Sequence, residues 1–194
     1  MGLAAKLEIE RYNYGDYIQW PDSERWEIID GTAYDMSPAP SPRHQEILGE
    51  LHRQLSNYLL DKTCSVYMAP FDVRFREADE KEEEIETVVQ PDISVICDPG
   101  KIDKRGCLGS PDLIIEIVSP ATAQKDMRDK FFTYEKFGVK EYWILHPDEQ
   151  ILLVFKLISN QMYGRPDIYS PRDGVKVGIF PELTIDLASV FKAS

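Results

Sequence analysis

The sequence predicts an α/β (α+β) domain in which helices flank a mixed β-sheet. Strand-like apolar segments outnumber helical ones, and the elements follow the order helix, several strands, helix, two strands. The second long helix, which Thr122 can cap and which should continue through Phe137, lies between two strand-like segments. A helix in that place permits a crossover connection between parallel strands. We therefore expect a mixed sheet with helices packed against it.

The length and composition of the chain are those of one folded domain. Its 194 residues can bury a sizeable core, and hydrophobic and charged residues make up 43% and 29% of the chain. These values exclude wholesale disorder. The formal net charge of −12 argues against indiscriminate binding to polyanions but does not exclude an enzyme that acts on nucleic acid. We interpret the strongly acidic residues 77–86 as a solvated loop.

The sequence predicts neither a membrane protein nor a disulfide framework. No apolar stretch is long enough to cross a bilayer and the first residues lack the apolar core of a signal peptide, so we expect a cytoplasmic protein. Cys64, Cys97 and Cys107 form an odd set without C-x-x-C spacing, and we expect them to be reduced. The three histidines lack the i, i+4 spacing of a helical zinc pair. We expect no organic cofactor.

The first part of the chain should contain a short helix, a hairpin and a long helix. Residues 11–20 are expected to form the short helix, and residues 26–36 a hairpin that turns at Asp30-Gly31. Ser41 can cap the long helix with Pro42 at its first position, and this helix should end near residue 61. Its apolar face consists of Ile47, Leu48, Leu51, Leu55, Tyr58 and Leu59.

The remaining chain alternates between strand-like segments and turns. Gly138 should end the second long helix, because glycine readily adopts the left-handed conformation found after helices. Residues 99–110 form a connection rich in glycine and lysine, and the tail after Gly164 is rich in turns. The expected strands are residues 64–68, 71–75, 88–96, 113–119, 141–145 and 151–158.

Two carboxylates interrupt these apolar strands. Glu116 lies within the apolar run 113–119, and Asp92 follows Pro91 within residues 88–96. A buried carboxylate needs a cation or hydrogen-bond donors, so both are candidates for chemistry if their strands are neighbours. The alternative is a structural role at a strand end, with hydrogen bonds to the backbone or a pairing with an arginine such as Arg128.

The second long helix adds a lysine to this pair. Asp126, Lys130 and Tyr134 recur every four residues and share one helix face. From that face Lys130 could reach the end of the strand that carries Glu116. The alternative is an ion pair between Lys130 and Asp126 on a hydrated surface, which contributes only a few tenths of a kcal/mol.

Several of these segments, in this order, resemble a known family. They are Pro91-Asp92, the stretch 116–120, Asp126, Lys130, Tyr134 and the stretch 138–143, preceded by the stretches 26–31 and 36–38 and by His44. Together they resemble the Uma-family restriction endonucleases. The resemblance covers residues 27–148. It implies a restriction-endonuclease-like mixed sheet flanked by helices, in one domain over residues 1–194. The nuclease core would span about residues 25–158, with the N-terminal helix and the C-terminal tail as appendages.

The resemblance also implies a chemistry. The family is placed in the PD-(D/E)-x-K nuclease superfamily, whose members cut phosphodiester bonds with a divalent metal. This implies that Asp92 and Glu116 bind Mg²⁺ or Mn²⁺, that DNA is the substrate, and that the protein is a homodimer. In the superfamily pattern a lysine lies two residues after the second acid, where this chain has Val118. Migration of the lysine to the following helix assigns the catalytic role to Lys130.

Further residues are candidates for the neighbourhood of this site. His44 could contact a phosphate at a helix N-terminus or could cap and pack the helix. Tyr134 lies on the same helix face as Lys130, and we expect Glu27 to support the hairpin. In the loop between the two acidic strands, Lys101, Lys104 and Arg105 could contact phosphates or remain solvated surface residues.

Two other classes of function remain open at this point. The first is a catalytically inactive nuclease-fold dimer that acts as a binding or interaction module, which Val118 and the negative net charge favour. The second is a hydrolase that acts on sugars through a pair of carboxylates without a metal. Neither a helix-turn-helix nor a zinc finger accompanies the core, so the sequence does not indicate a sequence specificity.

Overall fold

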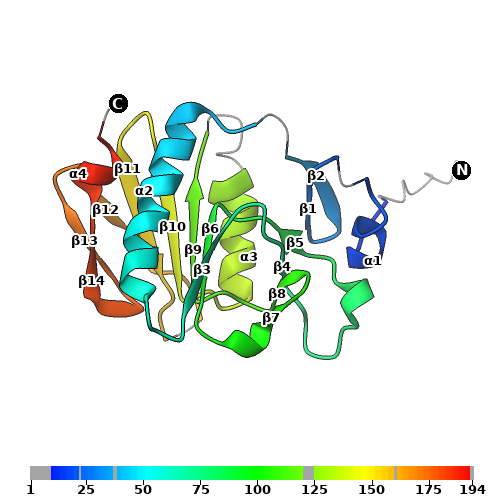
Figure 1. The fold of residues 1–194 in the computed structure, drawn as a ribbon. Coiled ribbons are helices and arrows are strands. Elements are labelled where there is room, and N and C mark those ends of the chain that lie inside the picture. The colour runs from blue at the N-terminus through cyan, green and yellow to red at the C-terminus, as the bar shows by residue number, and fades with distance from the viewer. Residues whose placement is uncertain (1–9, 22, 37–38, 120–124, 160, 193–194) are drawn as a thin grey trace, which may run out of the picture.

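Two six-stranded sheets form most of the protein (Figure 1). The computed structural model describes residues 10–192 except 22, 37–38, 120–124 and 160. The first sheet has the strand order β2-β1-β5-β4-β8-β7, and the second has the order β12-β11-β10-β9-β6-β3. A hairpin of β13 (Gly174–Val177) and β14 (Phe180–Asp186) completes the β-structure of the described residues. The predicted mixed sheet with flanking helices is confirmed.

The second sheet contains the predicted crossover. Its strands β9 and β10 pair in parallel, and the helical segment between them makes the connection. The other pairs in this sheet are antiparallel. From one edge to the other, its strands are β12 (Asp167–Tyr169), β11 (Ile151–Lys156), β10 (Glu141–His146), β9 (Leu113–Ile117), β6 (Ile93–Ile96) and β3 (Ser65–Met68).

The first sheet starts with the predicted hairpin. Asp30 and Gly31 join β1 and β2 with positive φ angles of 48° and 75°, the backbone geometry that favours Asp-Gly in tight hairpins. β4 and β8 pair in parallel, and the other pairs are antiparallel. The strands are β2 (Thr32–Asp35), β1 (Trp26–Ile29), β5 (Val88–Val89), β4 (Val73–Arg74), β8 (Gly106–Leu108) and β7 (Ile102–Asp103).

The single strand predicted for residues 88–96 is wrong. The chain leaves the first sheet after β5 and enters the second sheet at β6, so that Gln90, Pro91 and Asp92 lie between the two. Proline has no N–H to donate to a strand ladder, which explains the break at this point. The connection 99–110 contains two strands, β7 and β8, that the sequence did not predict. Strands this short carry almost no periodic signal.

The first long helix has the predicted beginning and end. α2 (Pro42–Leu59) begins after Ser41, whose side chain accepts a hydrogen bond from the His44 N–H, and it ends two residues before Asp61. The predicted N-terminal helix is shorter than expected. It consists of α1 (Tyr14–Tyr17), with Asn13 as its cap. In the acidic stretch, residues Glu82–Glu84 form one 3₁₀ turn.

The second long helix is irregular. The predicted cap, Thr122, lies outside the described residues. The described part begins with a π-helix over Lys125–Lys130 and continues as α3 (Phe131–Lys136). Gly138 follows with a φ of 75°, as predicted. A last short helix, α4 (Leu187–Val190), lies near the C-terminus. No helix in the described ranges is long and apolar enough to span a membrane.

The second sheet separates two apolar cores. On one face, α2 and the β13–β14 hairpin pack against the odd-numbered side chains of β9, Leu113, Ile115 and Ile117. On the other face, α3 packs together with residues of the first sheet against Ile114 and Val118 (Figure 1). Because side chains alternate along a strand, Glu116 points to the same face as Ile114 and Val118. That face, which lies between the two sheets and under α3, positions the candidate site.

The prediction of reduced cysteines is wrong for two of the three. Cys64 and Cys97 form a disulfide, whereas Cys107 is free and buried. β3 and β6 pair antiparallel with Ser65 opposite Ile96, which places the two flanking cysteines side by side. Their separation of 33 residues concealed this neighbourhood, because it arises only from the pairing of the strands.

The packing of α2 predicts opposite effects for two neighbouring substitutions. Leu51 is fully buried, so Leu51→Ala should lower the free energy of unfolding by about 2–5 kcal/mol through the cavity that it leaves. Gly49 lies in the same helix, and apart from its two flanking residues and the backbone of the helix itself, no described atom lies within 4 Å of the place that a Cβ would take. Gly49→Ala should therefore raise the free energy of unfolding, by up to about 1 kcal/mol. Urea denaturation measures both changes, and equal effects of the two substitutions would contradict this packing.

Candidate active site

A buried lysine joins the two sheets. The Nζ atom of Lys130 lies 2.8 Å from Oε1 of Glu116 on β9 and 2.8 Å from Oε1 of Glu27 on β1. Asp126, one helical turn earlier, has Oδ1 at 3.6 Å from the same nitrogen. The Lys130 side chain is 2% exposed, so the interpretation of Lys130 as a member of a hydrated surface pair is wrong. The lysine instead bridges carboxylates from two different sheets.

The helix that carries Lys130 is itself unusual. Lys130 is the last residue of the π-helix, a form that is rare in proteins and is often found at functional sites. Tyr134, in the next turn, donates a hydrogen bond of 2.8 Å from its hydroxyl group to Oε1 of Glu116. The hydroxyl group of Tyr142 on β10 donates a hydrogen bond of 3.0 Å to the carbonyl oxygen of Asp126. These contacts fix both ends of the segment over the sheet.

Asp92 lies close to Glu116, because it directly precedes β6, the strand that pairs with β9. Its Oδ2 atom accepts a hydrogen bond of 2.7 Å from the backbone N–H of Ile117, the residue that follows Glu116. The same oxygen lies 3.1 Å from Nε2 of His44. The sequence left open a structural role in which Asp92 bonds to the backbone, and the contact with Ile117 is of that kind. No pairing of either carboxylate with Arg128 is found among the described residues.

His44 belongs to the site through Asp92. It is the third residue of α2, and its Nδ1 atom is buried and has no hydrogen-bond partner among the described residues. The sequence left phosphate contact and helix packing as alternatives for His44. The structure places its ring against a carboxylate of the site, a contact that neither alternative includes.

Sequence reasoning missed the part that Glu27 plays. This residue is fully buried, and its Oε2 atom lies 2.6 Å from Nζ of Lys125. Its Oε1 atom, besides contacting Lys130, accepts a hydrogen bond of 2.9 Å from the backbone N–H of Gln90. The signal was present in the sequence, because Glu27 interrupts an apolar strand in the same way as Glu116. Its proximity to Lys130 depends on the packing of the two sheets.

The pKa values of the two buried glutamates are shifted in opposite directions. Burial raises the pKa of Glu116, and the charges of Asp126, Asp92 and Glu27 raise it further to about 8 although Lys130 opposes them. Burial also acts to raise the pKa of Glu27, but Lys130 and Lys125 outweigh it and lower that pKa to about 2.

Lys130 stays protonated in this environment. Burial acts to lower its pKa, but Glu116, Glu27 and Asp126 outweigh burial and raise the pKa well above the ordinary value. When all of these groups are ionised, Glu27, Asp92, Glu116 and Asp126 carry four negative charges, against two positive charges on Lys125 and Lys130. In that state the site has an excess of negative charge.

Glu116 and Asp92 each use one carboxylate oxygen in their side-chain contacts. Among the described residues, both contacts of Glu116 involve Oε1 and both contacts of Asp92 involve Oδ2. The second oxygen of each carboxylate makes no hydrogen bond or ion pair with the residues that the structure describes. No group of three or more His, Cys, Asp and Glu side chains suited to a metal ion is found in the described part of the chain. Mg²⁺ needs only one or two carboxylates, because it keeps several of its waters.

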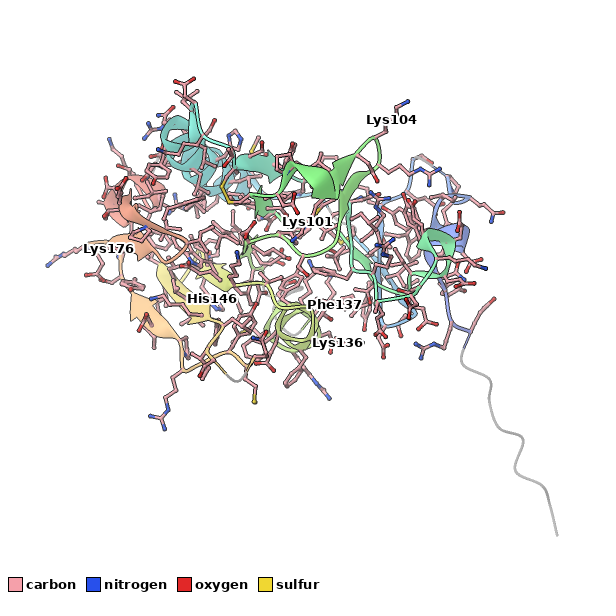
Figure 2. The ribbon with its side chains drawn as sticks, turned by 90° about the horizontal axis from the view of Figure 1, so that it is seen from below. Lys101, Lys104, Lys136, Phe137, His146 and Lys176 are labelled. Atoms are coloured by element: carbon pink, nitrogen blue, oxygen red, sulfur yellow. A yellow bond between two sulfur atoms is a disulfide. The ribbon has the colours of Figure 1, made fainter. Side chains whose placement is uncertain are left out.

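The basic residues of the β7–β8 region lie in different surroundings. Lys101 donates a hydrogen bond of 2.9 Å from Nζ to the carbonyl oxygen of Ser110. The guanidinium group of Arg105 lies 3.2 Å from Oε1 of Glu82. Figure 2 shows Lys104 at the periphery of the molecule, whereas Lys101 lies against its body. A contact of these residues with phosphate stays a prediction.

The second sheet carries α2 on one face and α3 on the other, which is the arrangement expected of a restriction-endonuclease-like fold. The family model Uma2, described as "Putative restriction endonuclease", matches residues 14–188. The chain therefore belongs to this family, and the resemblance inferred from the sequence motifs is confirmed.

The chain is also similar to one curated protein and to one solved structure. The protein is 27% identical over 121 residues to "Uncharacterized protein slr1290" from Synechocystis sp., and the match covers 61% of this chain and 60% of that protein. A crystal structure from Anabaena variabilis, described as that of "a putative nuclease belonging to DUF820", superposes with a TM-score of 0.73 at 22% identity. The superposition covers 92% of this chain and 97% of the Anabaena chain. At this level of identity the likeness shows a common fold.

The raised pKa of Glu116 predicts how stability depends on pH. Between 4.5, its ordinary pKa, and about 8, folded Glu116 holds a proton that the unfolded chain has lost. The free energy of unfolding of the wild type should therefore fall as pH rises through this range. Glu116→Gln removes this titration, so the variant should become more stable relative to the wild type as pH rises. Urea denaturation in EDTA across the range measures the difference. A difference that is independent of pH would contradict the raised pKa.

Proposed function

We propose that this protein is an endonuclease that hydrolyses phosphodiester bonds of DNA with Mg²⁺ or Mn²⁺. One observation carries the proposal: the buried ammonium group of Lys130 lies 2.8 Å from Glu116, whose neighbour Ile117 donates its N–H to Asp92. Two acids and a lysine form the functional set of the superfamily that the sequence resembles. Membership of a family described as restriction endonucleases supports the same chemistry.

Asp92 and Glu116 would hold the metal through their remaining carboxylate oxygens. When bound, the ion supplies an activated water and neutralises charge on the phosphate group. Hydrogen bonds within the protein hold both carboxylates in position without a metal ion. The Ile117 N–H and His44 orient Asp92, and the Tyr134 hydroxyl group orients Glu116. Such preorganisation avoids rearrangement at the moment of reaction.

Lys130 would stabilise the charge that develops on the phosphate during hydrolysis. Its ammonium group is fixed by carboxylates on two sides and stays protonated. A positive charge held in a site that excludes water acts more strongly than the same charge in solvent. Val118, at the superfamily's usual lysine position, packs in the apolar core beside α3.

The partners and location follow from the same proposal. DNA is the substrate that the description of the family favours. A homodimer would place two sites on the two strands of a duplex. The cytoplasm is the compartment that we infer for an enzyme acting on DNA, although the Cys64–Cys97 disulfide is a feature that is rare there.

The alternative is an inactive nuclease-fold dimer that acts as a binding module. The absence of a lysine at Val118 favours this alternative. The buried Lys130 weighs against it, because an ammonium group from another element lies beside Glu116. Burying a charged cluster costs more than packing apolar side chains in its place, so a binding module gains nothing from keeping it.

A cleavage assay tests the proposed function. Supercoiled and linear DNA are incubated at low salt with Mg²⁺, Mn²⁺ or EDTA, and the wild type is compared with Glu116→Gln and Lys130→Ala. Cleavage should require the metal and should fall by about 100-fold or more in both variants, since each removes a preorganised charge. Lys136→Ala is the matched control on the same helix, because Lys136 is exposed and pairs with Glu77 at the surface.

Each other result has a defined meaning. Loss of cleavage only in Glu116→Gln would keep the metal site and remove Lys130 from catalysis. Absence of cleavage in every condition, together with absence of Mn²⁺ binding by calorimetry, would overturn the proposal and favour the binding module.

A further inference from the structure

Glu27 has no opening to solvent and no oxygen without a contact. It is 0% exposed, and its two oxygens contact two lysines and one backbone N–H group. Its neighbours on β1, Ile28 and Ile29, are buried and apolar. An apolar residue could therefore pack at this position, and burying a carboxylate instead is costly for folding. A structural role alone gives little reason for the charge.

Two sets of contacts connect Glu27 with Glu116 and Asp92, the candidate metal ligands. Through Lys130 it reaches Glu116, because one ammonium group contacts both carboxylates. Through the N–H of Gln90 it holds the backbone two residues before Asp92, in the turn that passes from the first sheet to the second. Glu27, on the first sheet, thus contacts both the lysine beside Glu116 and the connection that leads to Asp92.

The same turn is held from its other side. The side-chain amide of Gln90 donates hydrogen bonds to Oδ1 of Asp72 and to the hydroxyl group of Tyr17. The guanidinium group of Arg25 donates to Oε1 of Gln90 at 2.9 Å. With its backbone on Glu27 and its side chain in this network, Gln90 has little freedom to move. The position of Asp92 is therefore coupled to that of Glu27.

The geometry of Lys130 shows what Glu27 adds. An ammonium group has three N–H donors, and those of Lys130 face Glu27, Glu116 and Asp126. The lysine side chain is long and flexible, so its charge has a defined place only where acceptors surround it. Glu27 is the carboxylate by which the first sheet holds this ammonium group beside Glu116.

We propose that Glu27 is a positioning residue of the active site, which fixes the Lys130 ammonium group beside Glu116 and fixes the turn that carries Asp92. This inference rests on the proposed function. Glu27 has no exposed surface with which to touch a substrate, and it acts through Lys130 and Gln90. Its replacement should slow the reaction without weakening the binding of DNA.

The test compares Glu27→Gln with the wild type. Glutamine keeps the size of the side chain and removes its charge. Glu24→Gln is the matched control, because Glu24 lies in the same segment, is exposed, and accepts a hydrogen bond only from the nearby Trp26 indole among the described residues. A double variant, Glu27→Gln with Lys125→Met, removes one carboxylate and one ammonium group together and so preserves the charge balance of the cluster.

Two measurements are made on each protein. The first is the kinetics of metal-dependent DNA cleavage, in which kcat should fall by about 10- to 100-fold in Glu27→Gln while KM stays near the wild-type value. The second is NMR of the lysine ammonium groups. The buried Lys130 group should give a slowly exchanging signal in the wild type, identified by its loss in Lys130→Arg. This signal should shift or disappear in Glu27→Gln and stay unchanged in Glu24→Gln.

The two readouts separate the two proposals. A wild type that neither cleaves DNA in any condition nor binds Mn²⁺ would overturn the proposed function, and the ammonium signal would still show whether Glu27 holds Lys130. An unchanged ammonium signal and an unchanged kcat in Glu27→Gln would overturn the positioning role. If the single variant does not fold, the double variant replaces it, and wild-type kcat in that protein would equally overturn the role.

Discussion

The ion pairs of one buried ammonium group connect the two halves of this protein. Lys130 approaches from a helix, Glu116 from the second sheet and Glu27 from the first, so that three separate elements meet at a single charge. Each carboxylate would be unfavourable in this place without its partner, because burial removes the water that would otherwise solvate it. The cluster therefore demands a specific arrangement of the sheets, while the apolar cores around it supply most of the stabilisation.

Sequence reasoning succeeded where the signal is local. The capped start of α2, the Asp-Gly turn and the glycine after α3 each depend on a few adjacent residues whose conformational preferences are strong. Glu116 and Asp92 could be identified because a charge within an apolar run is locally anomalous, whatever the rest of the chain does. The proximity of these two acids followed from the expectation that their strands are neighbours, and β6 and β9 do pair.

Prediction failed where the answer depends on which distant segments meet. The disulfide arises from the pairing of β3 with β6, and the division of residues 88–96 arises from the presence of a second sheet. Glu27 carried the same local signal as Glu116, but its contact with Lys130 requires the first sheet to pack beneath the crossover helix. Periodicity describes each segment separately and contains no information on such contacts.

The alternation of β9 has a consequence for how this site can vary. Glu116 and Val118 point to the same face of the sheet, and the crossover helix lies over that face. A lysine at either residue 118 or residue 130 would therefore deliver its charge into the same space between strand and helix. The fold defines a location for a cation and leaves open which segment provides it. A lysine supplied by the strand at residue 118 would thus replace one supplied by the helix without a change in the fold.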